Sequence, residues 1–360
     1  MEINLQKTRN LSYKKGFSFW TILLSVILIF TIIGAIAIGS TYIEPGVVYK
    51  VLINKLLNQD IFNSTWNIMF ENIIWEIRLP RVLLGAICGA GLALCGVLMQ
   101  CVTKNPIAEP YILGISSGAS CGAVGVIVLG GISAIGINSI SVGAFVGSII
   151  SGVLVFAIGT QMGKTTSTTR LVLTGMAIST IFSALTNLLI YSADNSNQAK
   201  NALFWTIGSL GGAKWDVLLF PFITLVVVII IAFIMSKSLD ILLLGDDSAI
   251  ILGINVKMIK SIILVLATLL TSSLVAITGA IGFIGLVVPH ISRTIAGSDH
   301  KKLIVLSALM GAIFLIVSDV LARGLFPPIE IPIGIITALI GGPFFLYLIS
   351  KKNYSFGGND

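Results

Sequence analysis

The chain has 360 residues, of which 56% are hydrophobic and 10% are charged, and its net charge is +7. A soluble domain carries about 25% charged residues, so this composition excludes a soluble protein and indicates a polytopic membrane protein. The excess of positive charge is explained below by membrane topology and does not require a nucleic-acid partner.

Ten apolar windows are long enough to cross about 30 Å of hydrocarbon. In chain order they cover residues 17–40, 79–102, 112–131, 140–162, 171–192, 216–236, 258–278, 280–296, 303–322 and 332–350. We therefore predict an all-α membrane domain of about ten spans over residues 17–350, with short termini at 1–16 and 351–360. The first window lacks a small-residue cleavage site, so we interpret it as an anchor and not as a removed signal peptide.

The basic residues predict the orientation of these spans. An even number of spans places both termini on one side, and most of the 22 lysines and arginines fall on that side. Cytosolic loops of membrane proteins are enriched in Lys and Arg, so both termini are predicted to be cytosolic. The longest outer loop is then 41–76, where residues 47–57 and 66–77 have the apolar spacing of short helices on the membrane surface.

Glycines recur at intervals of four residues within several spans. Small residues at this spacing let helices approach closely in lipid, so we expect tight packing in the middle of the bundle. The glycines concerned are Gly85, Gly89, Gly114, Gly118, Gly122, Gly143 and Gly147.

Between the sixth and seventh spans lies the segment 237–257, KSLDILLLGDDSAIILGINVK, which we name the insert. Gly245 and Gly253 bracket a run long enough for about two helical turns. Asp246 and Asp247 stand where acids favour the start of a helix. An element of this kind fits a groove on a soluble partner, but a solvated connector lying on the membrane surface explains the segment equally well.

The sequence lacks the signatures of nucleotide binding and catalysis. GTQMGKTT at 159–166 has one residue fewer than a P-loop between its first glycine and GK, and no strand precedes it. His290 and His300 are not paired, and His290 is better explained as a helix-terminal hydrogen-bonding residue than as a ligand. We predict that this chain is not an enzyme and holds no cofactor or metal.

The four cysteines have no CxxC spacing. Small buried apolar residues explain them better than a disulfide or a metal site does. They are Cys88, Cys95, Cys101 and Cys121.

Asp319 is the only acid deep within a predicted span, and an intramembrane ionisable group is a functional candidate by default. Arg323 lies four residues further on, on the same helix face. We therefore favour an internal salt bridge at the outer end of the ninth span over proton coupling. A proton-driven transporter normally needs further buried titratable groups, and the sequence offers few.

Six motifs together resemble the permease subunits of ATP-binding-cassette importers for ferric siderophores, haem and cobalamin. They are RLPR at 78–81, KNPIAEPYILGISSGA at 104–119, FWTIGSLGGAKW at 204–215, GAIGFIGLVVPHISR at 279–293, SDVLAR at 318–323 and IPIGIITALIGGPFFLYLI at 331–349. The resemblance covers nearly the whole chain after roughly the first 75 residues. It implies a ten-span protomer that pairs with a second copy or a paralogue in the cytoplasmic membrane of a bacterium or archaeon.

The resemblance also implies partners and site residues. In the family, two ATPases bind on the cytosolic side and a substrate-binding protein docks outside, where arginines receive its glutamates. The matching arginines here are Arg78, Arg81 and Arg323. Residues matching the coupling helix, which seats in the ATPase cleft, are Leu239, Leu243, Gly245, Asp246, Asp247, Ala249, Leu252 and Gly253. The cytosolic gate before the fifth span matches Thr168 and Thr169.

We therefore predict a permease subunit that moves an iron complex, with a ferric siderophore as the first choice of cargo and haem or cobalamin as alternatives. ATP hydrolysis is expected on partner chains. Two other classes stay open: an ion-coupled secondary transporter that uses Asp319, and a membrane scaffold whose insert recruits a soluble enzyme. The insert and the three arginines favour the importer, because a secondary carrier has no need of them.

Overall fold

The computed structural model describes residues 2–39, 41–64, 66–130, 139–161 and 168–351, and these residues are mostly helical. The elements are α1 (Glu2–Ala37), α2 (Pro45–Leu57), α3 (Ile68–Asn72), η1 (Ile73–Arg78), α4 (Leu79–Thr103), η2 (Pro110–Leu113), α5 (Ile115–Leu129), α6 (Ser139–Gln161), α7 (Thr168–Tyr191), α8 (Ser196–Ile207), α9 (Trp215–Ile234), α10 (Ser236–Leu242), α11 (Asp246–Ile251), α12 (Val256–Thr278), α13 (Ile284–Ala296), α14 (His300–Gly324) and α15 (Ile333–Lys351).

Eight helices of the described residues are long and apolar enough to cross a membrane, and the two shorter apolar helices α5 and α13 account for the remaining windows. This confirms the all-α polytopic class. The agreement has a simple cause: backbone groups in hydrocarbon must pair within their own segment, so a long apolar run is stable there as a helix.

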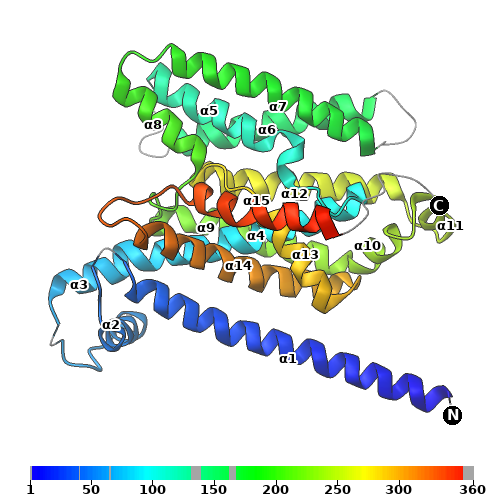
Figure 1. Ribbon diagram of the computed structural model, residues 1–360, viewed down its shortest axis with the longest axis horizontal. Helices are drawn as coiled ribbons and strands as arrows, with labels where there is room; N and C mark the ends of the chain where they lie inside the picture. Colours follow the sequence, from blue (N-terminus) through cyan, green and yellow to red (C-terminus); the bar gives the residue numbers. More distant parts are fainter. Residues whose placement is uncertain (1, 40, 65, 131–138, 162–167, 352–360) are drawn as a thin grey trace.

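Most of the helices run roughly along the long axis of the molecule (Figure 1). α5 to α8 form a layer on one side, α4, α9 and α12 to α15 form the central layer, and α1 lies at the opposite edge. α1 begins and α15 ends toward the same end of the long axis as α10 and α11, whereas α2, α3 and α8 lie toward the other end. Following the predicted topology, we name the end with α10 and α11 the inner end and the opposite one the outer end.

Glycines create the closest helix contacts. A Cβ atom added to Gly89 of α4 would lie 2.1 Å from the carbonyl oxygen of Gly311 of α14. One added to Gly122 of α5 would lie 2.0 Å from the carbonyl oxygen of Gly143 of α6. No larger residue fits at either crossing without separating the helices, so the close packing predicted from the glycine spacing is confirmed.

The surface helix predicted over 47–57 is present as α2, but the one predicted over 66–77 belongs to a longer body. α3 and the π-helix η1 run directly into α4, and one apolar helical body covers Ile68–Thr103. Pro80 has no N–H to donate to an earlier turn. The wider π turn, in which the Leu79 N–H bonds the Ile74 carbonyl, accommodates this interruption.

The window predicted over 280–296 becomes helical only at Ile284. Gly279 and Phe283 have φ angles of 68° and 70°, which an α-helix does not allow, so the chain turns between α12 and α13. α13 has 13 residues and extends for about 20 Å. Because Ile284 and Gly285 are buried, this helix starts inside the bundle.

Candidate functional site

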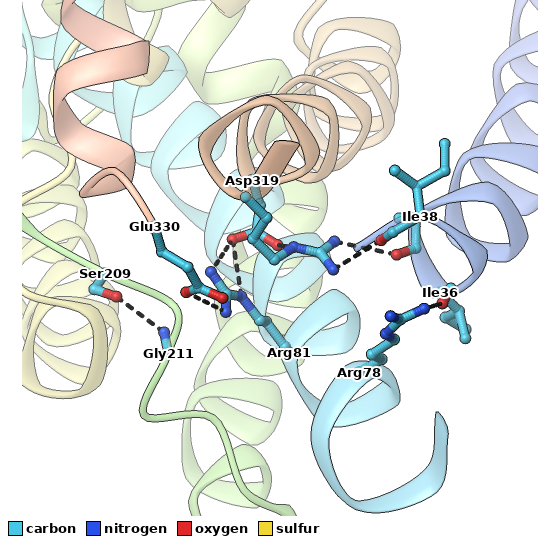
Figure 2. Close-up of polar contacts among 10 residues, drawn as sticks. Ile36, Ile38, Arg78, Arg81, Ser209, Gly211, Asp319 and Glu330 are labelled. Carbon is cyan, nitrogen blue, oxygen red and sulfur yellow. Dashed lines mark hydrogen bonds and ion pairs between the residues drawn. The ribbon is translucent and has the colours of Figure 1, made fainter. Parts of the chain in front are cut away.

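Five charged side chains gather at the outer end and form what we name the arginine cluster (Figure 2). It consists of Arg78, Arg81, Asp319, Arg323 and Glu330. The three arginines are the predicted docking residues. All three are buried, with 5%, 8% and 5% of their surfaces exposed, respectively. Their side chains therefore point into the protein and bond within the chain.

Arg78 holds the end of α1. Its Nη1 donates to the carbonyl oxygens of Ile36 at 2.7 Å and Ala37 at 2.9 Å, and its Nη2 donates to that of Thr41. A Cβ added to Gly39 would lie 2.7 Å from Nη2, so a larger residue at this position would have to displace the guanidinium group. The last carbonyls of a helix have no partner within it and carry partial negative charge, which explains why a guanidinium stabilises this end.

Arg323 approaches the same helix end from α14. Its Nη1 donates to the Ile38 carbonyl at 3.0 Å and its Nη2 to the Ala35 carbonyl at 3.1 Å. Its Nε lies 2.9 Å from Oδ2 of Asp319, which confirms the salt bridge predicted from their spacing. Two arginines thus join α1 to the rest of the bundle.

Asp319 has a second partner that the sequence did not indicate. Its Oδ1 lies 3.0 Å from both Nε and Nη2 of Arg81 on α4. The Asp319 side chain is only 3% exposed and lies between two guanidinium groups. This arrangement satisfies a buried carboxylate and links α4 to α14.

Arg81 also contacts Glu330, in the loop between α14 and α15. The Nη1 atom of Arg81 lies 2.8 Å from Oε2 of Glu330, whose side chain is 49% exposed. Glu330 is thus the one member of the arginine cluster whose side chain lies half in solvent.

At the inner end the insert forms two short helices, α10 and α11. Gly245 and Gly253 bracket α11 with φ angles of 119° and 81°, values that only glycine adopts readily. Asp246 and Asp247 fall in the first turn of α11. The short helix predicted between the two glycines is therefore confirmed.

Asp246 fastens α11 to two neighbouring helices. Its carboxylate lies 2.8 Å from Nζ of Lys104, just after α4, and 2.6 Å from Nζ of Lys260 on α12. Burial alone would raise the pKa of Asp246, but the two lysines outweigh it and lower this pKa below its usual value. The side chain of Lys260 is 3% exposed, so its ammonium group depends on Asp246 for a charged partner.

The predicted coupling residues divide by burial. Leu239 and Ala249 are fully buried and hold the insert against the bundle, and Leu243 is half-buried, whereas Asp247 and Leu252 are exposed. Burial removes Leu239 and Ala249 as direct contacts for a partner. The insert instead exposes neighbours that the prediction omitted: Leu244, Ile250 and Ile251, at 67%, 60% and 84%.

A further contact joins the insert to α14. Nδ1 of His300 lies 2.7 Å from Oδ1 of Asp240 on α10, and the same oxygen accepts from the His300 backbone N–H at 2.9 Å. His300 is fully buried. Because His300 is the first residue of α14, this pair fixes the start of that helix to the insert.

The predicted gate lies only partly within the described residues. α7 begins at Thr168, whose side chain lies outside them, as do residues 162–167, and Thr169 is exposed. The gate assignment stays a prediction. The P-loop lookalike at 159–166 also falls largely outside the described residues.

Two motif residues have roles that the sequence did not reveal. The carboxyl group of Glu109 lies in electrostatic contact with the backbone amides of Phe283 and Leu286, at the start of α13. The hydroxyl of Tyr111 donates to the Ile281 carbonyl at 2.9 Å and accepts from the Ile281 N–H at 3.0 Å. The segments 104–119 and 279–293, quoted above only as motifs, therefore hold each other in place.

The cysteines and the remaining histidine lie in packing environments. The ring of His290 stands edge-on against Phe344, with centroids 6.2 Å apart. None of the four cysteines forms a disulfide, and three are buried while Cys121 is half-buried. Within the described residues, no three His, Cys, Asp or Glu side chains form a group that could hold a metal ion.

Comparison with known proteins places this geometry in a family. The sequence model of the FecCD transport family matches residues 27–351. The chain belongs to that family. It is 39% identical over 330 residues to the Fe(3+)-citrate import system permease protein YfmE of Bacillus subtilis, covering 91% of this chain and 93% of that one.

Two further likenesses support the assignment. The chain is 40% identical over 298 residues to the hemin transport system permease protein HmuU of Yersinia pestis, covering 81% of this chain and 88% of the relative. A solved inward-facing structure of a metal-chelate type ABC transporter matches with a TM-score of 0.79 and 30% identity, over 92% of this chain and 99% of that chain. This FecCD chain therefore has both the sequence and the fold of a permease subunit.

Proposed function

We propose that this FecCD chain imports an iron complex across the cytoplasmic membrane of a bacterium or archaeon, powered by ATPases bound at its inner end. The carrying observation is the family match over nearly all spans, together with an exposed apolar insert at one end and a charged cluster at the other. A ferric siderophore is the first choice of cargo because the relatives include a permease named for ferric citrate. Haem, suggested by the hemin relative, and cobalamin are the alternatives.

The insert supports the ATPase assignment. Leu244 and the consecutive residues Ile250, Ile251 and Leu252 expose apolar side chains, and exposed apolar surface on an element outside the membrane is typical of a protein contact. The ion pairs of Asp246 fasten this patch to α4 and α12, and His300 fastens it to α14. Movement imposed on the insert therefore reaches three spans directly.

The arginine cluster supports a narrower docking site than the sequence suggested. Arg78 and Arg323 are engaged with the carbonyls of α1, so a partner would have to disrupt that helix end to reach them. Arg81 has a partner, Glu330, that is itself half in solvent. We assign the direct contact with a substrate-binding protein to Arg81. Arg78 and Arg323 support this contact by holding the end of α1 in place.

Ion coupling through Asp319 is the weaker alternative. Its carboxylate lies between Arg81 and Arg323. Without the charge of Asp319, the buried guanidinium of Arg323 would lose its anionic partner and Arg81 would keep only Glu330. This geometry suits a structural salt bridge better than a site that binds and releases protons.

Uptake by cells that lack this chain, compared with complemented cells, tests the proposal. Labelled ferric siderophores, haem and cobalamin are offered in parallel, and a strain with a hydrolysis-deficient partner ATPase serves as control. We expect selective loss of one cargo in both the deletion and the ATPase-deficient strain. Uptake that persists without ATP hydrolysis but requires Asp319 would replace the importer with a secondary transporter.

A further inference from the structure

The contacts of the arginine cluster differ in how easily a partner could replace them. Asp319 is 3% exposed and shared by two arginines, and the donors of Arg78 are bonded to backbone carbonyls of α1. Only the Arg81–Glu330 ion pair, at 2.8 Å, has a member that is 49% exposed. Half-exposed ion pairs contribute little to stability, so this contact is the one that can open without unfolding its surroundings.

The charges of the cluster favour an incoming anion. Three guanidinium groups face two carboxylates, so the cluster keeps an excess of positive charge even with Glu330 in place. If Glu330 turned outward, Nη1 of Arg81 would lack its anionic partner at the protein surface. Arginine offers a planar fork that suits a carboxylate, and an acidic side chain of another protein could take the vacated position.

The surface around Glu330 is that of a protein contact. Leu325, Phe326 and Ile329, in the same short loop, are exposed by 52%, 65% and 70%. Exposed apolar side chains in the same loop as a charged pair are consistent with a docking surface between proteins. The partner that fits is a soluble protein presenting an acidic residue with apolar neighbours.

We propose that Glu330 occupies the place of a partner carboxylate on Arg81, and that docking of the substrate-binding protein exchanges one acid for the other. The proposal rests on the proposed function, since it assumes an outer partner. Glu330 lies three residues before α15 begins at Ile333, and the Ile331 N–H bonds the Ala322 carbonyl of α14. The exchange would therefore act on the loop that leads into the last span.

The test measures the affinity of the permease and its ATPases, reconstituted in lipid nanodiscs, for the binding protein that supports uptake in cells. Glu330→Gln keeps the shape of the side chain and removes its charge. We expect it to bind the partner about two- to fivefold more tightly, because the internal competitor is weakened. Glu76→Gln removes the same charge from an exposed acid two residues before Arg78 in the chain, and it should change affinity much less.

Two further variants make the outcome decisive. Arg81→Gln should weaken docking, and the double variant Arg81→Gln with Glu330→Gln should show no gain over Arg81→Gln alone, because the gain operates through Arg81. Weaker binding by Glu330→Gln, or the same change as Glu76→Gln, would overturn the exchange. Loss of docking in Arg81→Gln with no effect of Glu330→Gln would overturn the exchange but leave Arg81 as a docking residue. A wild-type complex that transports without any outer partner would overturn both the exchange at Glu330 and the docking role of Arg81.

Discussion

At the outer end, three arginines turn inward and bond to α1 carbonyls and two carboxylates, whereas at the inner end four apolar side chains of the insert, those of Leu244 and residues 250–252, are exposed. The residue types would suggest the reverse, with charges in water and leucines in the core. Charge at the outer end holds spans together, whereas the apolar surface of the insert is exposed and is proposed above as the contact with an ATPase. A substitution at the outer end should therefore affect folding first, and one at the inner end should affect assembly first.

The largest effect is expected from Asp319→Leu, the strongest test of the structural role of the outer end. The variant leaves Arg81 and Arg323 buried without Asp319, and removing one partner of a buried ion pair costs about 3–5 kcal/mol. Thermal unfolding in detergent should show a large loss of stability. Glu76→Leu at the same end is the control and should unfold close to wild type. Equal unfolding temperatures for the two variants would mean that solvent satisfies the arginines.

The opposite behaviour is expected from Ile251→Asp at the inner end. Ile251 is 84% exposed, so the protomer should fold with nearly unchanged stability. A charge at the centre of an apolar contact should weaken association with the ATPase by about tenfold or more. Leu56→Asp, on α2 with 69% exposure, controls for a new acid on exposed apolar surface. If both variants bind the ATPase like wild type, the insert is not the contact.

How far the sequence alone could lead is clear from Asp319. Its bond to Arg323 was predictable, because four residues along a helix is a local relation. Its bond to Arg81 spans 238 residues, and no local pattern contains that information. The spans were predictable for the same reason as the first bond, because apolar runs determine a helix locally.

The direction in which a side chain faces was the information missing at both ends. Arg78 and Arg323 were predicted to face a partner because they stand at span ends. In the structure they are buried, because their guanidinium groups bond the carbonyls at the end of α1. Leu239 and Ala249 were predicted as contact residues of the insert. In the structure they lie on the buried faces of α10 and α11. The motif at 104–119 was recognised without its role, which appears only when Glu109 meets the start of α13.

A smaller effect is expected from Asp246→Asn in α11, compared with the same change at the neighbouring Asp247. Asp246→Asn weakens two ion pairs and leaves Lys260 buried without a charged partner, which should cost about 1–2 kcal/mol. The ratio of cargo transported to ATP hydrolysed should fall, because α11 is no longer fastened to α4 and α12. Asp247→Asn, exposed and adjacent, is the matched control. A wild-type ratio in Asp246→Asn would show that the lysines do not transmit motion.

The smallest effect is expected from pH, and it tests whether the lysines dominate the environment of Asp246. Their charge holds its pKa below the ordinary value of 3.8. A carboxyl group with a lowered folded-state pKa contributes its full stability above the unfolded pKa and loses it as pH falls through the folded pKa. The difference in thermal stability between wild type and Asp246→Asn should therefore stay constant from pH 8 to pH 5 and shrink only in stronger acid. A difference that already shrinks between pH 8 and pH 5 would mean that burial outweighs the lysines, and that Asp246 is partly neutral in the folded protein.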